Sequence, residues 1–274
     1  MSIYQTIDKI VKWAESESNI LALVQTGSLA RDDKWVDEYS DCDIELICQN
    51  PSILTLDEDW LHNFGDICVI LSFDEGQEYP TKLVIFDDMI KIDFSICDKN
   101  RIKSQENKLC GLYDRGYRII IDKNNICNNL PKASGKSKLP EPPSQKEYID
   151  TIREFWFEAA HIPKYLARDD LWIVKFRDWT MKEMLLRMLE WNAQVLNQSD
   201  TWHIGTHMKE WVTPEQWSSM FKIFSHFEAK DSYECLLHQL DLFRVLSKEI
   251  GIKLNYEYPE DIDAKITDYI KSLR

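Results

Sequence analysis

The sequence predicts an α+β protein, in which an N-terminal mixed β-sheet with helices precedes a C-terminal α-helical bundle. Two patterns support this fold class. Short runs of alternating apolar and polar residues fill the first part of the chain and are typical of half-buried strands. After residue 144, apolar side chains recur at helical spacing. Residues 124–144 are polar and proline-rich, so we expect domains over 1–140 and 141–274.

The N-terminal elements follow from the spacing of apolar residues. A helix over 3–14 is predicted by apolar residues on one helical face, and a buried strand over 21–26 follows it. Further strands are predicted over the ranges 41–46, 66–72, 83–90 and 90–96. Asp87 and Asp88 predict the hairpin turn that joins the last two strands.

The C-terminal elements carry helix-start signals. Ser144 with Glu147, and Thr213 with Gln216, have the spacing of capping boxes, and Pro214 suits the first turn of a helix. Apolar residues repeat with helical period over 148–166, 181–191 and 236–250. These signals predict a bundle whose tryptophan and methionine stripes form its core.

Three aspartates are the main candidates for chemistry. Alternation places Asp41, Asp43 and Glu45 on the face of their strand opposite to Cys42, Ile44 and Leu46. Asp93 has the same position on the polar face of the strand over 90–96. Carboxylates on neighbouring strands suit Mg²⁺, which prefers oxygen ligands and often shares them with a substrate's phosphates. Two such ions activate an attacking hydroxyl and stabilise a leaving pyrophosphate.

A Gly-Ser pair precedes these carboxylates. Gly27 ends the strand over 21–26, where the missing side chain lets the backbone approach a phosphate closely. Ser28 offers a hydroxyl and an amide to a triphosphate. The acidic residues Asp32, Asp33, Asp37 and Glu38 lack the glycine turn of an EF-hand, so we interpret them as part of a solvated loop facing the substrate.

Composition restricts the function classes. The 274 residues carry a net charge of −14, which argues against a nucleic-acid partner and favours attraction of cationic small molecules. The sequence shows no long apolar run and no signal-peptide pattern, and its seven cysteines form no Cys-x-x-Cys pair. We therefore expect a cytoplasmic protein without membrane segments, whose cysteines are buried thiols.

The chain resembles the nucleotidyltransferases of the DNA polymerase β type, and within them the aminoglycoside 6-adenylyltransferases that inactivate streptomycin. Beyond the aspartates and the Gly-Ser pair, the resemblance lies in blocks that occur in the family's order: Trp60–Gly65, Lys91–Phe94, Glu154–Trp156, Met188–Trp191 and Asp241–Arg244. It covers essentially the whole chain. Two positions differ, because the family often has arginine where this chain has Leu29 and a more apolar residue where it has Glu45.

The resemblance implies an Mg²⁺-dependent adenylyltransferase that uses ATP, two Mg²⁺ ions and a cationic antibiotic. Asp41, Asp43 and Asp93 would be the metal ligands and catalytic residues. Gly27, Ser28 and Lys175 would bind the nucleotide, the lysine by reaching the triphosphate. Asp169, Asp170 and Glu190 would hold the cationic acceptor, because carboxylates commonly bind aminoglycosides.

Two alternatives share these features. The same chemistry on a lincosamide or another small hydroxyl compound fits the aspartates equally well. A relative that binds nucleotide without transferring it, including a regulatory or toxin-antitoxin partner, is disfavoured by the intact set of three aspartates. The sequence fixes neither the acceptor hydroxyl nor the oligomeric state.

Overall fold

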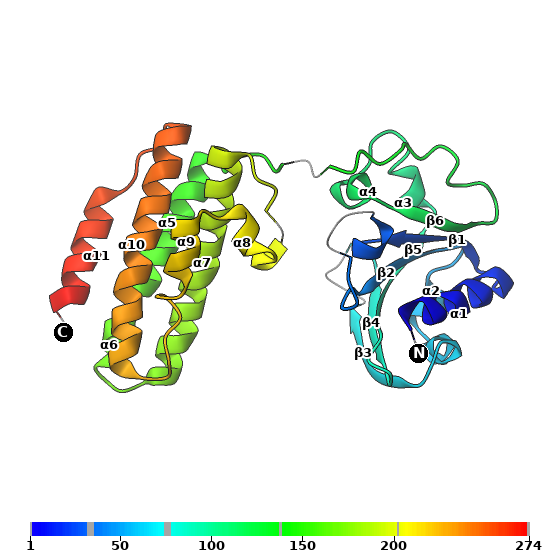
Figure 1. Cartoon of the computed structure of the whole chain (residues 1–274), viewed down its shortest axis with the longest axis horizontal. Helices are drawn as coiled ribbons and strands as arrows, with labels where there is room; N and C mark the ends of the chain where they lie inside the picture. Colours follow the sequence, from blue (N-terminus) through cyan, green and yellow to red (C-terminus); the bar gives the residue numbers. More distant parts are fainter. Residues whose placement is uncertain (1, 32–35, 74–77, 137–138, 202, 273–274) are drawn as a thin grey trace. The chain divides into compact units, whose positions relative to one another are not determined.

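The computed structural model describes residues 2–31, 36–73, 78–136, 139–201 and 203–272. The chain divides into two compact units, Met1–Ser137 and Lys138–Arg274. The first combines a sheet with helices and the described part of the second is helical, so the α+β fold class is confirmed (Figure 1). Residues 32–35, which begin the predicted acidic loop, lie outside the described residues.

A six-stranded mixed sheet forms the centre of the first unit. The strand order is β3-β4-β5-β2-β1-β6, in which β2 and β5 are parallel and the other neighbours are antiparallel. The strands are β1 (Ile20–Thr26), β2 (Cys42–Cys48), β3 (Ile67–Phe73), β4 (Thr81–Phe86), β5 (Lys91–Asp98) and β6 (Arg118–Asp122). The sequence predicted all of these strands except β6.

Helices cover both faces of the sheet (Figure 1). One face packs on α1 (Ile3–Ser16) and on the 3-10 helix η2 (Asp59–Asn63), through Ile10, Trp60 and Phe94. The other face packs on α3 (Asn100–Lys103) and α4 (Gly111–Arg115). The first unit also contains the 3-10 helix η1 (Ser28–Ala30) and the short helix α2 (Ser52–Thr55). Both faces of β2 are therefore buried along most of its length.

The β4–β5 hairpin turn is confirmed. The Phe86 amide donates to the Ile90 carbonyl at 3.0 Å, and the Met89 amide donates to the Phe86 carbonyl at 2.9 Å. Met89 has φ 62°, so the left-handed position of the turn is filled by a residue other than glycine. This turn fixes where β5 begins along β4.

The second unit is a bundle built around three long helices. Its helices are α5 (Gln145–Ala159), α6 (Ile162–Leu166), α7 (Leu171–Asn197), η3 (His203–Gly205), α8 (Met208–Trp211), α9 (Pro214–Met220), α10 (Ala229–Leu254) and α11 (Glu260–Ser272). Both predicted capping boxes are present, at Ser144 and Thr213. The rings of Phe155 and Phe243 stack at 3.5 Å in the core between α5 and α10.

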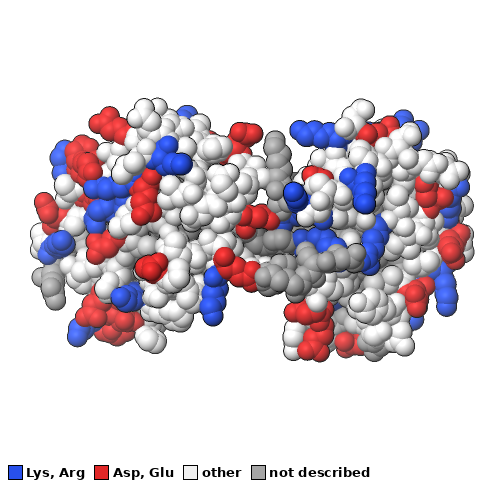
Figure 2. All heavy atoms as spheres, turned by 45° about the horizontal axis from the view of Figure 1, so that its top comes forward, with Lys and Arg blue, Asp and Glu red and all other residues white. Residues whose placement is uncertain are grey.

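Two surface properties follow from the described residues. Acidic and basic side chains are interspersed on the face of the molecule that Figure 2 shows. None of the described helices combines the length and the apolar character that crossing a bilayer requires.

Candidate active site

The strand pairing brings two of the predicted aspartates together. Asp43 on β2 lies directly opposite Asp93 on β5 in the parallel register, and Thr26 at the end of β1 lies opposite Asp43 on the other side. Paired residues on adjacent strands point to the same face of a sheet, so both carboxylates lie on the face covered by α3 and α4. Asp41 is the residue just before β2, and its side chain is half exposed.

Gly27 packs against one of these carboxylates. The residue has φ 68°, and a Cβ at this position would lie 1.8 Å from Asp43 Oδ2. Both the left-handed conformation and the close approach therefore require glycine. Next to it, Ser28 begins η1, and its hydroxyl donates to the Asp41 carbonyl at 3.5 Å. The predicted Gly-Ser pair thus lies beside Asp41 and Asp43, which together with Asp93 form the carboxylate cluster.

Lys91 is a member of the cluster that the sequence did not single out. Its Nζ donates to Asp41 Oδ2 at 2.7 Å and to Asp93 Oδ2 at 2.9 Å. Lys91 stands two residues before Asp93 on β5, so the alternation that identified Asp93 also places Lys91 on the same face. Its contact with Asp41 depends on the pairing of β2 with β5, which a sequence pattern does not reveal.

Electrostatics within the cluster disfavour fully ionised carboxylates. Burial raises the pKa of Asp43 to about 6, with a further contribution from the neighbouring Asp93 carboxylate, whereas Lys91 opposes the shift. Burial also raises the pKa of Asp93, although its hydrogen bond from Lys91 acts in the opposite direction. Asp93 Oδ1 is buried and accepts no hydrogen bond in the described structure. Burial therefore disfavours the charged form of Asp43 and of Asp93, and one Asp93 oxygen is left without a hydrogen bond.

These residues fit a hard divalent cation by their chemistry. All three side chains offer carboxylate oxygens, which are the ligands that Mg²⁺ prefers, and Asp93 Oδ1 is a buried oxygen without a partner. Among the residues that the structure describes, no three His, Cys, Asp or Glu side chains are already arranged to hold a metal. The Lys91 ammonium lies between Asp41 and Asp93 instead.

Glu45 forms a buried ion pair on this face of β2. It points to the same face as Asp43, as alternation predicts, yet it is only 3% exposed. Arg101 donates to Glu45 through Nε at 2.9 Å and through Nη2 at 2.6 Å, and the Tyr113 hydroxyl donates at 2.7 Å. Glu45 therefore joins the sheet to α3 and α4 through charge-assisted hydrogen bonds.

Lys175, the lysine predicted to bind the nucleotide, forms hydrogen bonds within the second unit. Lys175 Nζ donates to Ser225 Oγ at 2.6 Å and to Ser232 Oγ at 2.8 Å, and it also contacts the carbonyls of Ser225 and His226. These contacts join α7 to the segment before α10 and to its first turn. The structure thus gives Lys175 a tethering role that the sequence did not predict.

The predicted acceptor residues lie at two ends of one helix. Asp169 and Asp170 are exposed at the start of α7, and Asp169 has φ 57°. Glu190 lies 20 residues further along the helix than Asp170, at about 1.5 Å per residue or about 30 Å away. Burial raises the pKa of Glu190, and Arg187 opposes that shift. The structure therefore does not bring the three carboxylates together.

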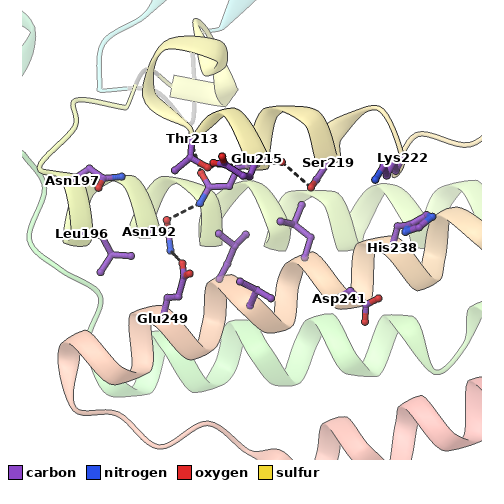
Figure 3. Close-up of a pocket in the computed structure, with 14 residues that line it drawn as sticks. Asn192, Leu196, Asn197, Thr213, Glu215, Ser219, Lys222, His238, Asp241 and Glu249 are labelled. Atoms are coloured by element: carbon purple, nitrogen blue, oxygen red, sulfur yellow. Dashed lines mark hydrogen bonds between the residues drawn. The ribbon is translucent and has the colours of Figure 1, made fainter.

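A pocket of about 580 Å³ lies between α7, α9 and α10 (Figure 3). Buried Asn192 donates to Glu249 Oε2 at 2.8 Å and accepts a hydrogen bond from Gln216 at 2.9 Å. The pocket is also lined by Glu215, Lys222, His238, Asp241 and Glu249. The predicted residues Asp169, Asp170, Lys175 and Glu190 are not among those that line this pocket.

The chain is similar to known proteins over nearly its whole length. An aminoglycoside 6-adenylyltransferase from Campylobacter jejuni is 23% identical over 276 residues, which span 97% of this chain and 93% of the relative. The enzyme of that name from Staphylococcus aureus is 21% identical, over 98% of this chain and 97% of the relative. A crystal structure of an aminoglycoside 6-adenyltransferase from Bacillus subtilis aligns with a TM-score of 0.49 and 19% identity, over 100% of this chain and 99% of that one. The streptomycin adenylyltransferase family model matches residues 2–273, and the chain therefore belongs to that family.

Proposed function

We propose that this protein transfers AMP from ATP to a hydroxyl of streptomycin and releases pyrophosphate. One observation carries the proposal: in a chain of the streptomycin adenylyltransferase family, Asp43 and Asp93 face the same side of paired strands, beside the close turn at Gly27. The curated relatives from three bacteria are named aminoglycoside 6-adenylyltransferases, which supports an aminoglycoside as the acceptor.

Each residue of the cluster has a role in this reaction. Asp93 accepts the proton of the attacking hydroxyl. The hydroxyl oxygen then bonds to the α-phosphorus, and the bond from that phosphorus to the leaving pyrophosphate oxygen breaks. Gly27 allows the backbone to approach the phosphates, and Ser28 offers its hydroxyl to them. Two Mg²⁺ ions held by Asp41, Asp43, Asp93 and ATP would neutralise the phosphate charge.

The second unit supplies the remaining proposed contacts. Lys175 would bind the triphosphate after giving up its contacts with Ser225 and Ser232, so Lys175→Met is expected to raise the KM for ATP. Asp169 and Asp170 form one candidate grip on a guanidinium group, and Glu190 is a separate one, because helix α7 holds them apart. Asp170→Asn and Glu190→Gln therefore test two different acceptor contacts.

We place this activity in the cytoplasm, where ATP is available. All seven cysteines are free thiols, and five of them are buried: Cys42, Cys48, Cys97, Cys127 and Cys235. Buried free thiols suit a reducing compartment.

The test is to incubate the purified protein with ATP, Mg²⁺ and streptomycin, and to measure the products by mass spectrometry together with pyrophosphate release. We expect adenylylated streptomycin, no reaction in excess EDTA, and no reaction with Asp43→Asn. Asp87→Asn serves as a matched control, because this exposed hairpin residue lies on the chain outside the carboxylate cluster. Adenylylation that continues in EDTA would contradict the metal-dependent mechanism.

The acceptor is tested separately from the chemistry. Asp170→Asn is expected to raise the KM for streptomycin about ten- to a hundredfold and to spare the KM for ATP, if this residue makes a charge-assisted contact. Increasing salt should weaken drug binding in parallel. If a panel that includes lincosamides yields an adenylylated product from another compound only, the transfer chemistry stands and streptomycin is the wrong acceptor. If ATP binds but no compound is modified, the nucleotide-binding relative is the correct alternative.

A further inference from the structure

The Lys91 ammonium lies between two carboxylates of the cluster. Its ammonium lies 2.7 Å from Asp41 Oδ2 and 2.9 Å from Asp93 Oδ2, so it joins residues from two neighbouring strands. The Lys91 side chain is 31% exposed, compared with 48% for Asp41 and 21% for Asp93. The ammonium is therefore partly desolvated by its contacts, and it compensates two charges at once.

Hydrogen bonding outweighs burial at this lysine. Burial by itself would lower the Lys91 pKa, but the hydrogen bonds to Asp41 and Asp93 raise it, and the ammonium stays charged. Arg31, after the turn η1, adds a weaker positive influence on Asp43. Lys91 is therefore an internal counter-ion of the Asp41 and Asp93 carboxylates.

The Asp41 and Asp93 carboxylates that contact Lys91 are also proposed ligands for Mg²⁺. A divalent ion bound by Asp41 Oδ2 and Asp93 Oδ2 would have to share them with the Lys91 ammonium, and the two cations would repel each other strongly at such short separation. A divalent ion and the Lys91 ammonium therefore cannot both bind these two oxygens unless the lysine moves.

We infer that Lys91 is a resident counter-ion which a divalent metal must displace. It stabilises the metal-free carboxylates and weakens the binding of free metal. The negative charge of a triphosphate offsets this competition, so metal and nucleotide load together. Lys91 is thus a positioning residue that sets when the site is occupied, and this inference rests on the metal site of the proposed function.

The first experiment measures Mn²⁺ binding without nucleotide, by electron paramagnetic resonance, for the wild type and three variants. Lys91→Met is expected to bind Mn²⁺ at least about tenfold more tightly than the wild type, because it removes a unit charge next to the ion. Lys91→Arg keeps the charge and should stay near the wild type. Lys103→Met, at an exposed lysine on α3, makes the same change in net charge and should have no effect.

Three results bear against the inference. Equal or weaker Mn²⁺ binding by Lys91→Met shows that the lysine does not compete with metal. An equal gain in Lys103→Met shows that only net charge matters. Weaker binding of a non-hydrolysable ATP analogue by Lys91→Met, with unchanged Mn²⁺ binding, assigns the lysine to the phosphates instead. Wild-type turnover with Mg²⁺ and ATP, measured in parallel, shows whether the proposed function itself has failed.

A second measurement needs no variant. Acetylation of wild-type lysines, followed by peptide mass spectrometry, reports how accessible the Lys91 amine is. In EDTA the two ion pairs should protect Lys91, whereas saturating Mn²⁺ should release it and speed its acetylation several-fold relative to Lys103. Acetylation of Lys91 at one rate in both conditions would overturn the displacement.

Discussion

Asp43→Asn should stabilise the metal-free protein, and the structure sets the size of the effect. Burial next to Asp93 raises the pKa of Asp43 from 3.8 to about 6. A shift of about two pKa units corresponds to about 3 kcal/mol at most. Between these two pKa values the folded state holds a proton that the unfolded state releases, so the free energy of unfolding falls as pH rises through this range. Above pH 6 the ionised Asp43 carboxylate destabilises the folded state by the full amount. Below the pKa that Asp43 has in the unfolded chain, this destabilisation is absent.

The assay is urea unfolding in EDTA, followed by circular dichroism from pH 4 to pH 8. Asp43→Asn should raise the free energy of unfolding by up to about 3 kcal/mol at pH 7.5, and the gain should shrink towards zero at pH 4. Asp41→Asn is the contrasting variant, because the Asp41 carboxylate is half exposed and paired with Lys91, so no comparable gain is expected. A gain for Asp43→Asn that does not change with pH would show that the burial argument is wrong.

The remaining predictions concern packing at named contacts. Gly27→Ala should destabilise the first unit and abolish transfer, since the new Cβ would meet Asp43 Oδ2; thermal unfolding together with the activity assay checks both. Arg101→Met should cost about 3 to 5 kcal/mol in urea unfolding, because it leaves the buried Glu45 carboxylate without its ion-pair partner; an Arg101→Met protein as stable as the wild type would contradict this. Gly251→Ala should lower the melting temperature of the second unit, because its Cβ would lie 2.8 Å from a buried tyrosine hydroxyl on α5; unchanged melting would show that the helices move apart easily.

The sequence predicted those parts of the fold that depend on local patterns. Alternation located β2 and β5 and the side of each strand that carries Asp43 and Asp93, because side-chain direction repeats every two residues. Capping boxes located the starts of α5 and α9, since their hydrogen bonds lie within four residues. The fold class followed from these elements.

The features that the sequence did not predict depend on contacts between segments that are far apart in the chain. The Lys91–Asp41 ion pair spans 50 residues, and the Arg101–Glu45 pair spans 56, so neither is visible as a local motif. The strand β6 is five residues long and only partly buried, which leaves too short a pattern to detect. Asp170 and Glu190 were grouped by charge alone, whereas the length of one uninterrupted helix separates them.

Transferase activity should depend closely on the parallel register of β2 and β5, because this register places Asp43 beside Asp93. A slip of β5 by one residue would turn Asp93 and Lys91 together to the opposite face, although the amount of strand structure would hardly change. The alignment of β5 with β4 is set at one end by the hairpin turn at Met89, two residues before Lys91. Insertions or deletions in that turn should therefore yield protein with a normal circular dichroism spectrum and no transferase activity, so the tolerance of this turn to changes in length is dictated by chemistry as well as by stability.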